Sequence, residues 1–138
     1  MMRKNMLFWV AVIISLNVIS CQENVQQKDT SGQASQNEVF EKIDVAQLKA
    51  MITENSQLQL IDVRTPKEYS DGYIGKAKNI NFFDDDFTTQ VSKKLDKNKP
   101  VVLYCRSGRR SANAALKLKD LGFKQIYDLN GGILSWKE

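Results

Sequence analysis

Short aliphatic runs alternate with amphipathic segments over residues 39–138, and this alternation restricts the fold more than any other feature of the chain. The clearest strand is Val101–Tyr104, an unbroken apolar run of the kind that is buried on both faces of a sheet. A helix is expected over residues 110–121, where alanine and leucine side chains fall on one side. Strands separated by helices predict an α/β fold, a three-layer sandwich around a mostly parallel sheet. Ligands bind beyond the carboxyl ends of such strands, so we expect the site directly after Tyr104.

Helix caps and turn residues place the remaining elements. We expect further strands over residues 39–43, 58–63, 80–82 and 125–129, and helices after Asp44, over residues 67–71 and over residues 84–95, with a last helical turn between Gly131 and Trp136. Asp44 offers an N-cap oxygen, and Thr65 followed by Pro66 suits a helix start. These elements fit one compact domain over residues 39–138.

The first residues read as a secretory leader. Arg3 and Lys4 precede an apolar run over residues 6–19, which is the layout of a signal peptide over residues 1–20. A helix of that run reaches only about 21 Å at 1.5 Å per residue, short of the roughly 30 Å hydrocarbon core of a bilayer. The polar residues 21–38 that follow contain too little apolar surface to fold and predict a flexible tether.

The end of the leader, Val18–Cys21, resembles the lipobox of bacterial lipoproteins. That resemblance implies cleavage before Cys21 and lipid modification of its thiol, and several acyl chains would make a stable membrane anchor. The alternative is an ordinary cleaved signal peptide with an incidental cysteine. Both interpretations place the domain outside the cytoplasm, in the cell envelope, either periplasmic or surface-exposed.

The chain has no histidine and only two cysteines, Cys21 and Cys105. The absence of histidine excludes Ser-His-Asp and Cys-His catalysis and argues against a zinc site, and we expect no metal and no organic cofactor. The formal net charge of +4 comes from 20 basic and 16 acidic residues that are interspersed, apart from the arginines of residues 106–110. This distribution lacks the broad basic face of a nucleic-acid-binding protein and favours a local site for a small anion.

The segment after the clearest strand has a direct chemical interpretation. It reads Cys105-Arg106-Ser107-Gly108-Arg109-Arg110 and leads into the helix over residues 110–121. Backbone N–H groups of a tight loop at a helix start converge on one point, and Gly108 permits the turn. The helix end and the arginines would stabilise a Cys105 thiolate and attract an anionic substrate. A cysteine buried only for packing, and arginines that are only solvated surface charges (Arg109 above all), are the alternatives.

Three segments resemble the rhodanese family. Residues 104–112 resemble its active-site loop, Ile61–Pro66 with Glu68-Tyr69 its Asp-Val-Arg segment, and residues 121–123 and 129–133 with Trp136 its C-terminal signature. The resemblance implies a five-stranded parallel sheet flanked by helices and transfer of sulfane sulfur through a persulfide on Cys105. Asp62 and Arg64 would support the site, either by substrate contact or by an ion pair that positions the loops. Tyr73 and Gly75-Lys76 depart from the family's pattern, in a segment that is mainly structural there.

We therefore expect a sulfurtransferase that takes sulfur from a small anionic donor such as thiosulfate and passes it to a thiol, of a small molecule or a protein, or to cyanide. Cys105 would be the nucleophile, and Arg106, Ser107, Gly108, Arg109 and Arg110 would bind the substrate. The expected protein is a monomer that contacts the membrane through its anchor and binds no nucleic acid.

Two other functions remain open at this point. Cysteine phosphatases and arsenate reductases share the thiolate-in-loop design, but the phosphatase pattern has an arginine where this chain has Ser111, and often a histidine where it has Tyr104. The shorter loop, which ends at Arg110, suits sulfur better than a phosphoryl group with its equatorial oxygens. A non-catalytic rhodanese-like binding module is the other alternative, although such modules often lack the cysteine.

Overall fold

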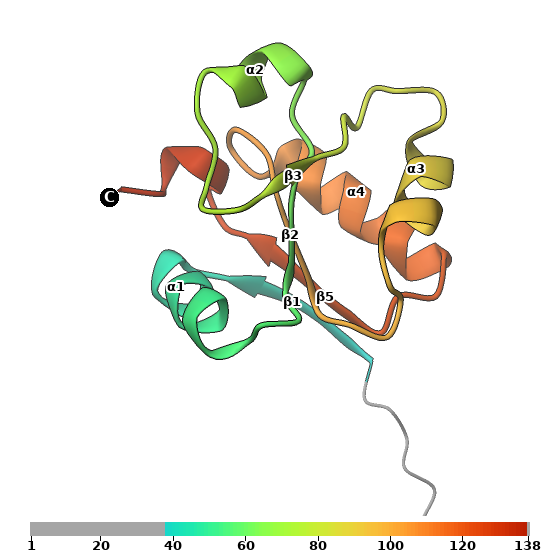
Figure 1. Cartoon of the computed structure of the whole chain (residues 1–138), viewed down its shortest axis with the longest axis horizontal. Coiled ribbons are helices and arrows are strands. Elements are labelled where there is room, and N and C mark those ends of the chain that lie inside the picture. Colours follow the sequence, from blue (N-terminus) through green and yellow to red (C-terminus); the bar gives the residue numbers. More distant parts are fainter. Residues whose placement is uncertain (1–37, 138) are drawn as a thin grey trace, which may run out of the picture. The chain divides into compact units, whose positions relative to one another are not determined.

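The computed structural model describes residues 38–137, which form a single five-stranded sheet with helices on both faces (Figure 1). The strands are β1 (Val39–Ile43), β2 (Gln59–Asp62), β3 (Lys78–Asn79), β4 (Val101–Tyr104) and β5 (Gln125–Leu129). Their order in the sheet is β1-β5-β4-β2-β3, and every neighbouring pair is parallel. The expected α/β fold with a five-stranded parallel sheet is confirmed.

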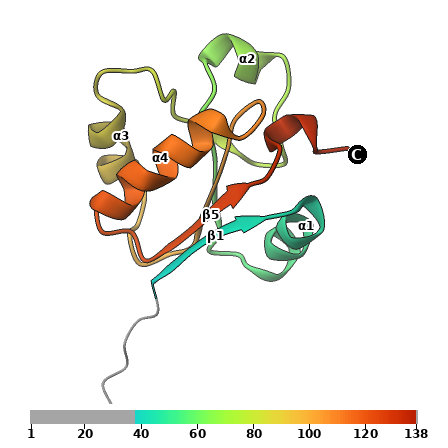
Figure 2. The ribbon, with the colours of Figure 1, turned by 180° about the vertical axis from the view of Figure 1, so that it is seen from behind.

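The helices cover the sheet on both faces, as parallel sheets require. They are α1 (Val45–Glu54), α2 (Pro66–Ser70), α3 (Phe87–Lys94), α4 (Arg109–Asp120) and the 3₁₀ turn η1 (Gly132–Leu134). Helices α3 and α4 lie on one face, and α1 with η1 lies on the other, as the front and back views show (Figures 1 and 2). Helix α2 lies beyond the end of the sheet, near the loop that follows β4 (Figure 2).

The apolar core consists of two clusters, one on each face of the sheet. The cluster under α3 and α4 includes Ile61, Leu103 and Cys105, and the cluster under α1 includes Leu60, Val102 and Tyr104. All four residues of β4 are fully buried because this strand lies in the middle of the sheet and contributes side chains to both clusters in alternation. The residue that follows β4 therefore emerges from the buried centre of the sheet.

Local sequence signals fix the starts of α1 and α2. Asp44 caps α1, with its carboxylate accepting from the Gln47 N–H at 2.8 Å. Thr65 caps α2 in a reciprocal capping box with Glu68, and Pro66 occupies the first helical position. The start signals predicted at Asp44 and Thr65-Pro66 are thus confirmed.

The expected strand over residues 80–82 is wrong, because regular pairing ends at Asn79. The side-chain amide of Asn79 donates to the carbonyls of Asp62 (3.0 Å) and Arg64 (2.8 Å). The Ile80 N–H still donates to the Asp62 carbonyl at 3.0 Å, but the Phe82 N–H donates to the Val63 carbonyl at 3.1 Å, so the regular ladder stops. The expected helix over residues 84–95 begins only at Phe87, and the last helical turn is the 3₁₀ turn η1.

The predicted leader over residues 1–20, Cys21 and the tether up to residue 37 lie outside the described residues, so these interpretations stay predictions. Among residues 38–137, no helix combines the length and the apolar character needed to cross a bilayer.

Candidate active site

The sheet order brings two loops together at its carboxyl edge. Strands β2 and β4 are neighbours, with Asp62 opposite Tyr104 in the register. The loop that follows β2 starts at Val63, and the loop that follows β4 starts at Cys105, so the two leave the same edge side by side. A parallel sheet places ligand sites at this edge, which makes the Cys105 loop the candidate site.

The Cys105 sulfur is enclosed by hydrogen-bond donors of its own loop. The residue is only 1% exposed, and its Sγ accepts from the Gly108 N–H at 3.1 Å and from the Ser111 hydroxyl at 3.7 Å. Burial by itself raises the pKa of this thiol, but the backbone and side-chain hydrogen bonds of Ser111 and the N–H groups of Gly108 and Ser107 more than offset that effect. The net result is a pKa below the ordinary value of a cysteine, which favours the nucleophilic thiolate.

Two glycines give the loop this shape. Gly108 has a φ of 103°, in the left-handed region that side chains disfavour, and it is the residue that precedes α4. This conformation turns its N–H toward the sulfur while its carbonyl accepts the helix bond from Ala112. The structure therefore has the turn at Gly108 that the sequence predicts.

Gly132 supports the loop from the C-terminal turn. A Cβ at this position would overlap the Cys105 carbonyl oxygen and lie 2.7 Å from the Arg106 carbonyl. The close approach lets the Ile133 N–H donate to the Cys105 carbonyl (2.9 Å) and the Leu134 N–H to the Arg106 carbonyl (3.2 Å). The two loop carbonyls therefore point away from the sulfur, and the loop N–H groups are left facing it.

The loop arginines fall into two groups. Arg106 and Arg109 are exposed, and neither forms an ion pair within the described part of the chain. Arg110 instead forms a two-pronged pair with Glu68 of α2, Nη1 to Oε2 at 2.7 Å and Nη2 to Oε1 at 2.6 Å. Its hydrogen bonds lower the pKa of Glu68 to about 2. Arg110 therefore joins the Cys105 loop to α2, whereas Arg106 and Arg109 are the two loop arginines without an ion pair among the described residues.

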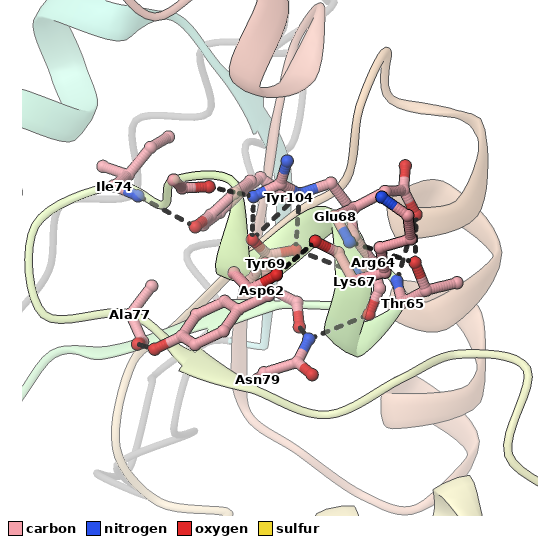
Figure 3. Close-up of polar contacts among 12 residues, drawn as sticks. Asp62, Arg64, Thr65, Lys67, Glu68, Tyr69, Ile74, Ala77, Asn79 and Tyr104 are labelled. Carbon is pink, nitrogen blue, oxygen red and sulfur yellow. Dashed lines mark hydrogen bonds and ion pairs between the residues drawn. The ribbon is translucent and has the colours of Figure 1, made fainter.

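Asp62 and Arg64 form a second, more deeply buried pair at the end of β2 (Figure 3). The Asp62 carboxylate accepts from the Arg64 Nη2 at 2.6 Å, from its Nε at 2.9 Å and from its backbone N–H at 2.9 Å. The Arg64 Nη2 also donates to the Gly72 carbonyl at 2.6 Å. Because the Asp62 and Arg64 side chains bond to each other and to backbone groups, the arrangement favours the interpretation that this ion pair positions loops.

Three tyrosines have structural positions. The Tyr104 hydroxyl, fully buried under α1, accepts from the Ile74 N–H at 3.0 Å (Figure 3), which directs Tyr104 away from the Cys105 sulfur. Tyr73, one of the departures from the family pattern, stacks on Tyr69 at 4.3 Å between ring centroids. The Tyr69 hydroxyl in turn donates to the Ala77 carbonyl at 2.7 Å.

The structure thus brings together all predicted loop residues, whereas Asp62 and Arg64 form a pair of their own at the end of β2. Sequence reasoning did not assign a role to Glu68, Ser111 or Gly132. Glu68 offered a detectable signal, since it stands three residues after Thr65 in a capping-box pattern. Its bond to Arg110 joins residues 42 positions apart, and no local pattern indicates such a contact.

Known proteins of similar sequence and structure share one kind of domain. A sequence profile of the rhodanese-like domain family matches residues 44–138. The Bacillus subtilis protein YtwF is 37% identical over 98 residues, which cover 71% of this chain and 91% of YtwF. The thiosulfate sulfurtransferase GlpE of Shewanella oneidensis is 33% identical over 99 residues, covering 72% and 94%. The crystal structure of a rhodanese-like domain protein from Staphylococcus aureus superposes with a TM-score of 0.63 at 29% identity, covering 72% of this chain and 93% of that one.

Proposed function

Because the chain belongs to the rhodanese-like domain family, we propose that it is a rhodanese-type sulfurtransferase that carries sulfur as a persulfide on Cys105. Relatives named as sulfurtransferases at 32–33% identity support the reaction class. The observation that carries the proposal is the Cys105 sulfur itself, which accepts hydrogen bonds from the Gly108 N–H and the Ser111 hydroxyl in a chain without histidine.

The reaction has two steps. The Cys105 thiolate attacks the outer sulfur of a donor such as thiosulfate, a new S–S bond forms, and sulfite leaves with the electron pair of the broken bond. An acceptor thiolate, or cyanide, then attacks the terminal sulfur of the persulfide, and the electron pair of that S–S bond returns to Cys105. The thiolate is regenerated, and no redox partner, metal or organic cofactor is needed.

The loop stabilises charge at both steps. Its N–H groups at Gly108 and Ser107 lower the thiol pKa, and the same groups face the terminal sulfur while negative charge moves between the two sulfur atoms. Arg106, exposed in the loop directly after Cys105, attracts the dianionic donor. We assign Arg110 mainly to loop position, because both terminal nitrogens of its guanidinium bond to Glu68.

The phosphatase and arsenate reductase alternatives receive less support. The Ser111 side chain, which stands where the phosphatase pattern has an arginine, is fully buried and directed at the Cys105 sulfur. Arg110 is bonded to Glu68, so its guanidinium is not free to enclose equatorial phosphoryl oxygens. A binding module without catalysis would not need a thiol whose pKa is lowered, as that of Cys105 is.

A thiosulfate–cyanide assay on the full chain tests the proposal. Cys105→Ser should abolish thiocyanate formation, since a hydroxyl cannot form the persulfide. Cys21→Ser is the matched control, because it removes the other cysteine of the chain and should leave the rate unchanged. Full activity of Cys105→Ser, or release of phosphate from aryl phosphates in place of sulfur transfer, would refute the proposal.

We also propose that the domain is lipid-anchored in the cell envelope, on the sequence pattern of Arg3-Lys4, the apolar residues 6–19 and the Val18–Cys21 segment. Cell fractionation tests this proposal. The wild-type chain should sediment with membranes, and Cys21→Ser should not be lipidated. A wild-type chain found entirely in the soluble cytoplasmic fraction would contradict it.

A further inference from the structure

A cavity of about 550 Å³ lies along the edge of β2 and has no role in the reaction described above. Its lining comes from the end of α1 and the turn after it, from β2, from the segment around β3 and from the end of α3, and the residues that matter here are Ile52, Leu58, Leu60, Lys76, Lys78 and Leu95. All lining residues lie outside α2 and outside residues 105–111. The volume is within the range of about 300–1,000 Å³ that small-molecule sites usually have.

The cavity forms because β3 is shorter than the strand that it flanks. Strand β3 has only two residues, and they pair with Ile61 and Asp62 at the carboxyl end of β2. The first two residues of β2, Gln59 and Leu60, pair with β4 on one side and have no partner in β3 on the other. Lys76, two residues before β3, lines the cavity and does not continue the ladder. The amino-terminal half of this sheet edge is therefore open.

One main-chain donor of this open edge lacks a partner. The Gln59 N–H donates to the Pro100 carbonyl at 2.9 Å, on the β4 side, and successive N–H groups of a strand point to opposite sides, so that of Leu60 faces β3. A longer ladder would offer it the Lys76 carbonyl, but within residues 38–137 no hydrogen bond joins the two. Leu60 is only 8% exposed, and a shielded main-chain N–H requires an acceptor. An oxygen atom of a ligand would supply one.

The walls of the cavity are apolar on both sides of the sheet edge. Leu58 and Leu60 belong to the apolar cluster under α1, and Ile61 and Leu95 belong to the cluster under α3 and α4. Ile52 of α1 lines the cavity as well and is 39% exposed. An apolar group placed here would contact aliphatic side chains from both clusters.

The charge around the cavity is positive. Among its lining residues in the described part of the chain, only Lys76 and Lys78 are charged, and both are exposed. Neither of them forms an ion pair within residues 38–137. Gly75 and Lys76, which depart from the family's pattern, both belong to the lining. Two free ammonium groups beside an apolar wall are complementary to an anion that carries an apolar body.

We propose that this cavity is a binding site for a small anionic amphiphile, a carboxylate with an apolar chain. The carboxylate binds between Lys76 and Lys78 and accepts from the Leu60 N–H, and the apolar chain packs on Leu58 and Leu95. An added peptide strand fits less well, because only two residues of β2 are unpaired at this edge and strand addition uses a longer run of main-chain groups. The inference is independent of the sulfur transfer proposed above.

Titration of the isotope-labelled full chain with octanoate tests the proposal, with the amide signals of Leu60 and Gly75 followed by NMR. Individual amides distinguish the cavity from the residues 6–19, which are apolar enough to bind an amphiphile on their own. Octanol has the same chain length without the charge, and acetate has the charge without the chain. All three titrations are run at constant ionic strength, because salt screens exposed charges.

Octanoate should shift both amides saturably, with a dissociation constant of about a few millimolar or below. Octanol should bind more weakly, and acetate should produce no saturable shift. Lys76→Gln/Lys78→Gln should weaken octanoate about five-fold and leave octanol unchanged. Lys67→Gln/Lys119→Gln, which removes two exposed lysines of α2 and α4, is the matched control and should change neither affinity.

Ile52→Trp places a larger side chain in the cavity and should prevent saturable binding of octanoate, and the same spectrum shows whether the variant is folded. No saturable shift at either amide of the parent protein, or equal affinity for octanol and octanoate, would overturn the proposal. An octanoate affinity that Lys76→Gln/Lys78→Gln leaves unchanged would overturn it too. So would an equal loss in the two lysine double variants, because net charge alone would then explain the effect.

Discussion

Two arginine–carboxylate pairs border the candidate site, and they differ in burial and in what they connect. Asp62 and Arg64 are two residues apart, with side chains 0% and 7% exposed. Glu68 and Arg110 are 42 residues apart, with side chains 30% and 17% exposed. The first pair fixes the end of one strand, and the second joins α2 to the loop that contains Cys105.

The comparison shows that the same chemical pair serves two purposes at this edge. Burying an ion pair costs desolvation free energy, so the intact pair adds little net stability. Removing one partner, however, leaves the other charge buried and unpaired, which is strongly destabilising. A half-buried pair between distant segments contributes less to the fold but determines where the loop lies relative to α2. We therefore expect the Asp62–Arg64 pair to control stability and the Glu68–Arg110 pair to control the geometry around the sulfur.

Removing one member of the buried Asp62–Arg64 pair should cause the largest loss of unfolding free energy. Arg64→Met leaves the Asp62 carboxylate buried without its cation, which typically destabilises a fold by about 3–5 kcal/mol. Urea denaturation measures this loss, and the double variant Asp62→Asn/Arg64→Met should recover much of it because no charge remains unpaired. A loss below about 1 kcal/mol in Arg64→Met would remove the distinction between the two pairs.

Breaking the second pair should affect the site more than the fold. Glu68→Gln should cost about 1–3 kcal/mol in unfolding free energy, the usual range for a charge-assisted hydrogen bond. It should also reduce the rate of sulfur transfer, since Arg110 is released and the loop loses its contact with α2. Glu38→Gln is the matched control: it breaks the exposed pair with Lys124, whose side chains are 64% and 34% exposed, and should change neither quantity measurably.

The loss of stability at acidic pH also tests the Glu68–Arg110 pair. The pKa of Glu68 is about 2, lowered mainly by its hydrogen bond to Arg110, against an ordinary value of 4.5. A depressed folded-state pKa contributes stability that is present above the unfolded pKa and lost as the pH falls toward about 2. The stability difference between wild type and Glu68→Gln should therefore shrink over that interval, and a difference that stays constant down to about pH 2 would contradict the assignment.

Asp128 has no arginine partner among residues 38–137, and its contribution to stability should change with pH in the opposite direction from that of Glu68. This change in stability should also be the smallest of those predicted. Its folded-state pKa is raised by burial, so it contributes stability below the unfolded pKa and loses it as the pH rises through the folded pKa. Asp128→Asn should therefore be more stable than wild type at neutral and alkaline pH, by about 1 kcal/mol. Thermal denaturation over a pH series measures this, and a destabilised variant would contradict it.

Local sequence patterns predicted the structural features that depend on residues close together in the chain. The strand Val101–Tyr104, the caps at Asp44 and Thr65, and the turn at Gly108 follow from periodicity and backbone preference within a few residues. Resemblance to a known family added the identity of the loop, which periodicity alone does not supply.

The parts that sequence reasoning missed depend on contacts between distant segments. Strand β3 ends at Asn79, whose side-chain amide bonds to carbonyls of β2 and its loop, and the pattern of residues 80–82 does not indicate these contacts. The position of Arg110 depends on Glu68, and that of the Cys105 carbonyl on the Ile133 N–H. Such contacts exist only once the sheet order places these segments at one edge.

The central claim, a persulfide on Cys105, is tested most directly by the intact mass of the protein after exposure to thiosulfate. In the Cys21→Ser background the protein should gain one sulfur atom, located on the peptide that contains Cys105 and lost on addition of cyanide. The same treatment of Cys105→Ser should leave the mass unchanged. A sulfur atom gained by Cys105→Ser, or none gained by the parent protein, would contradict the claim.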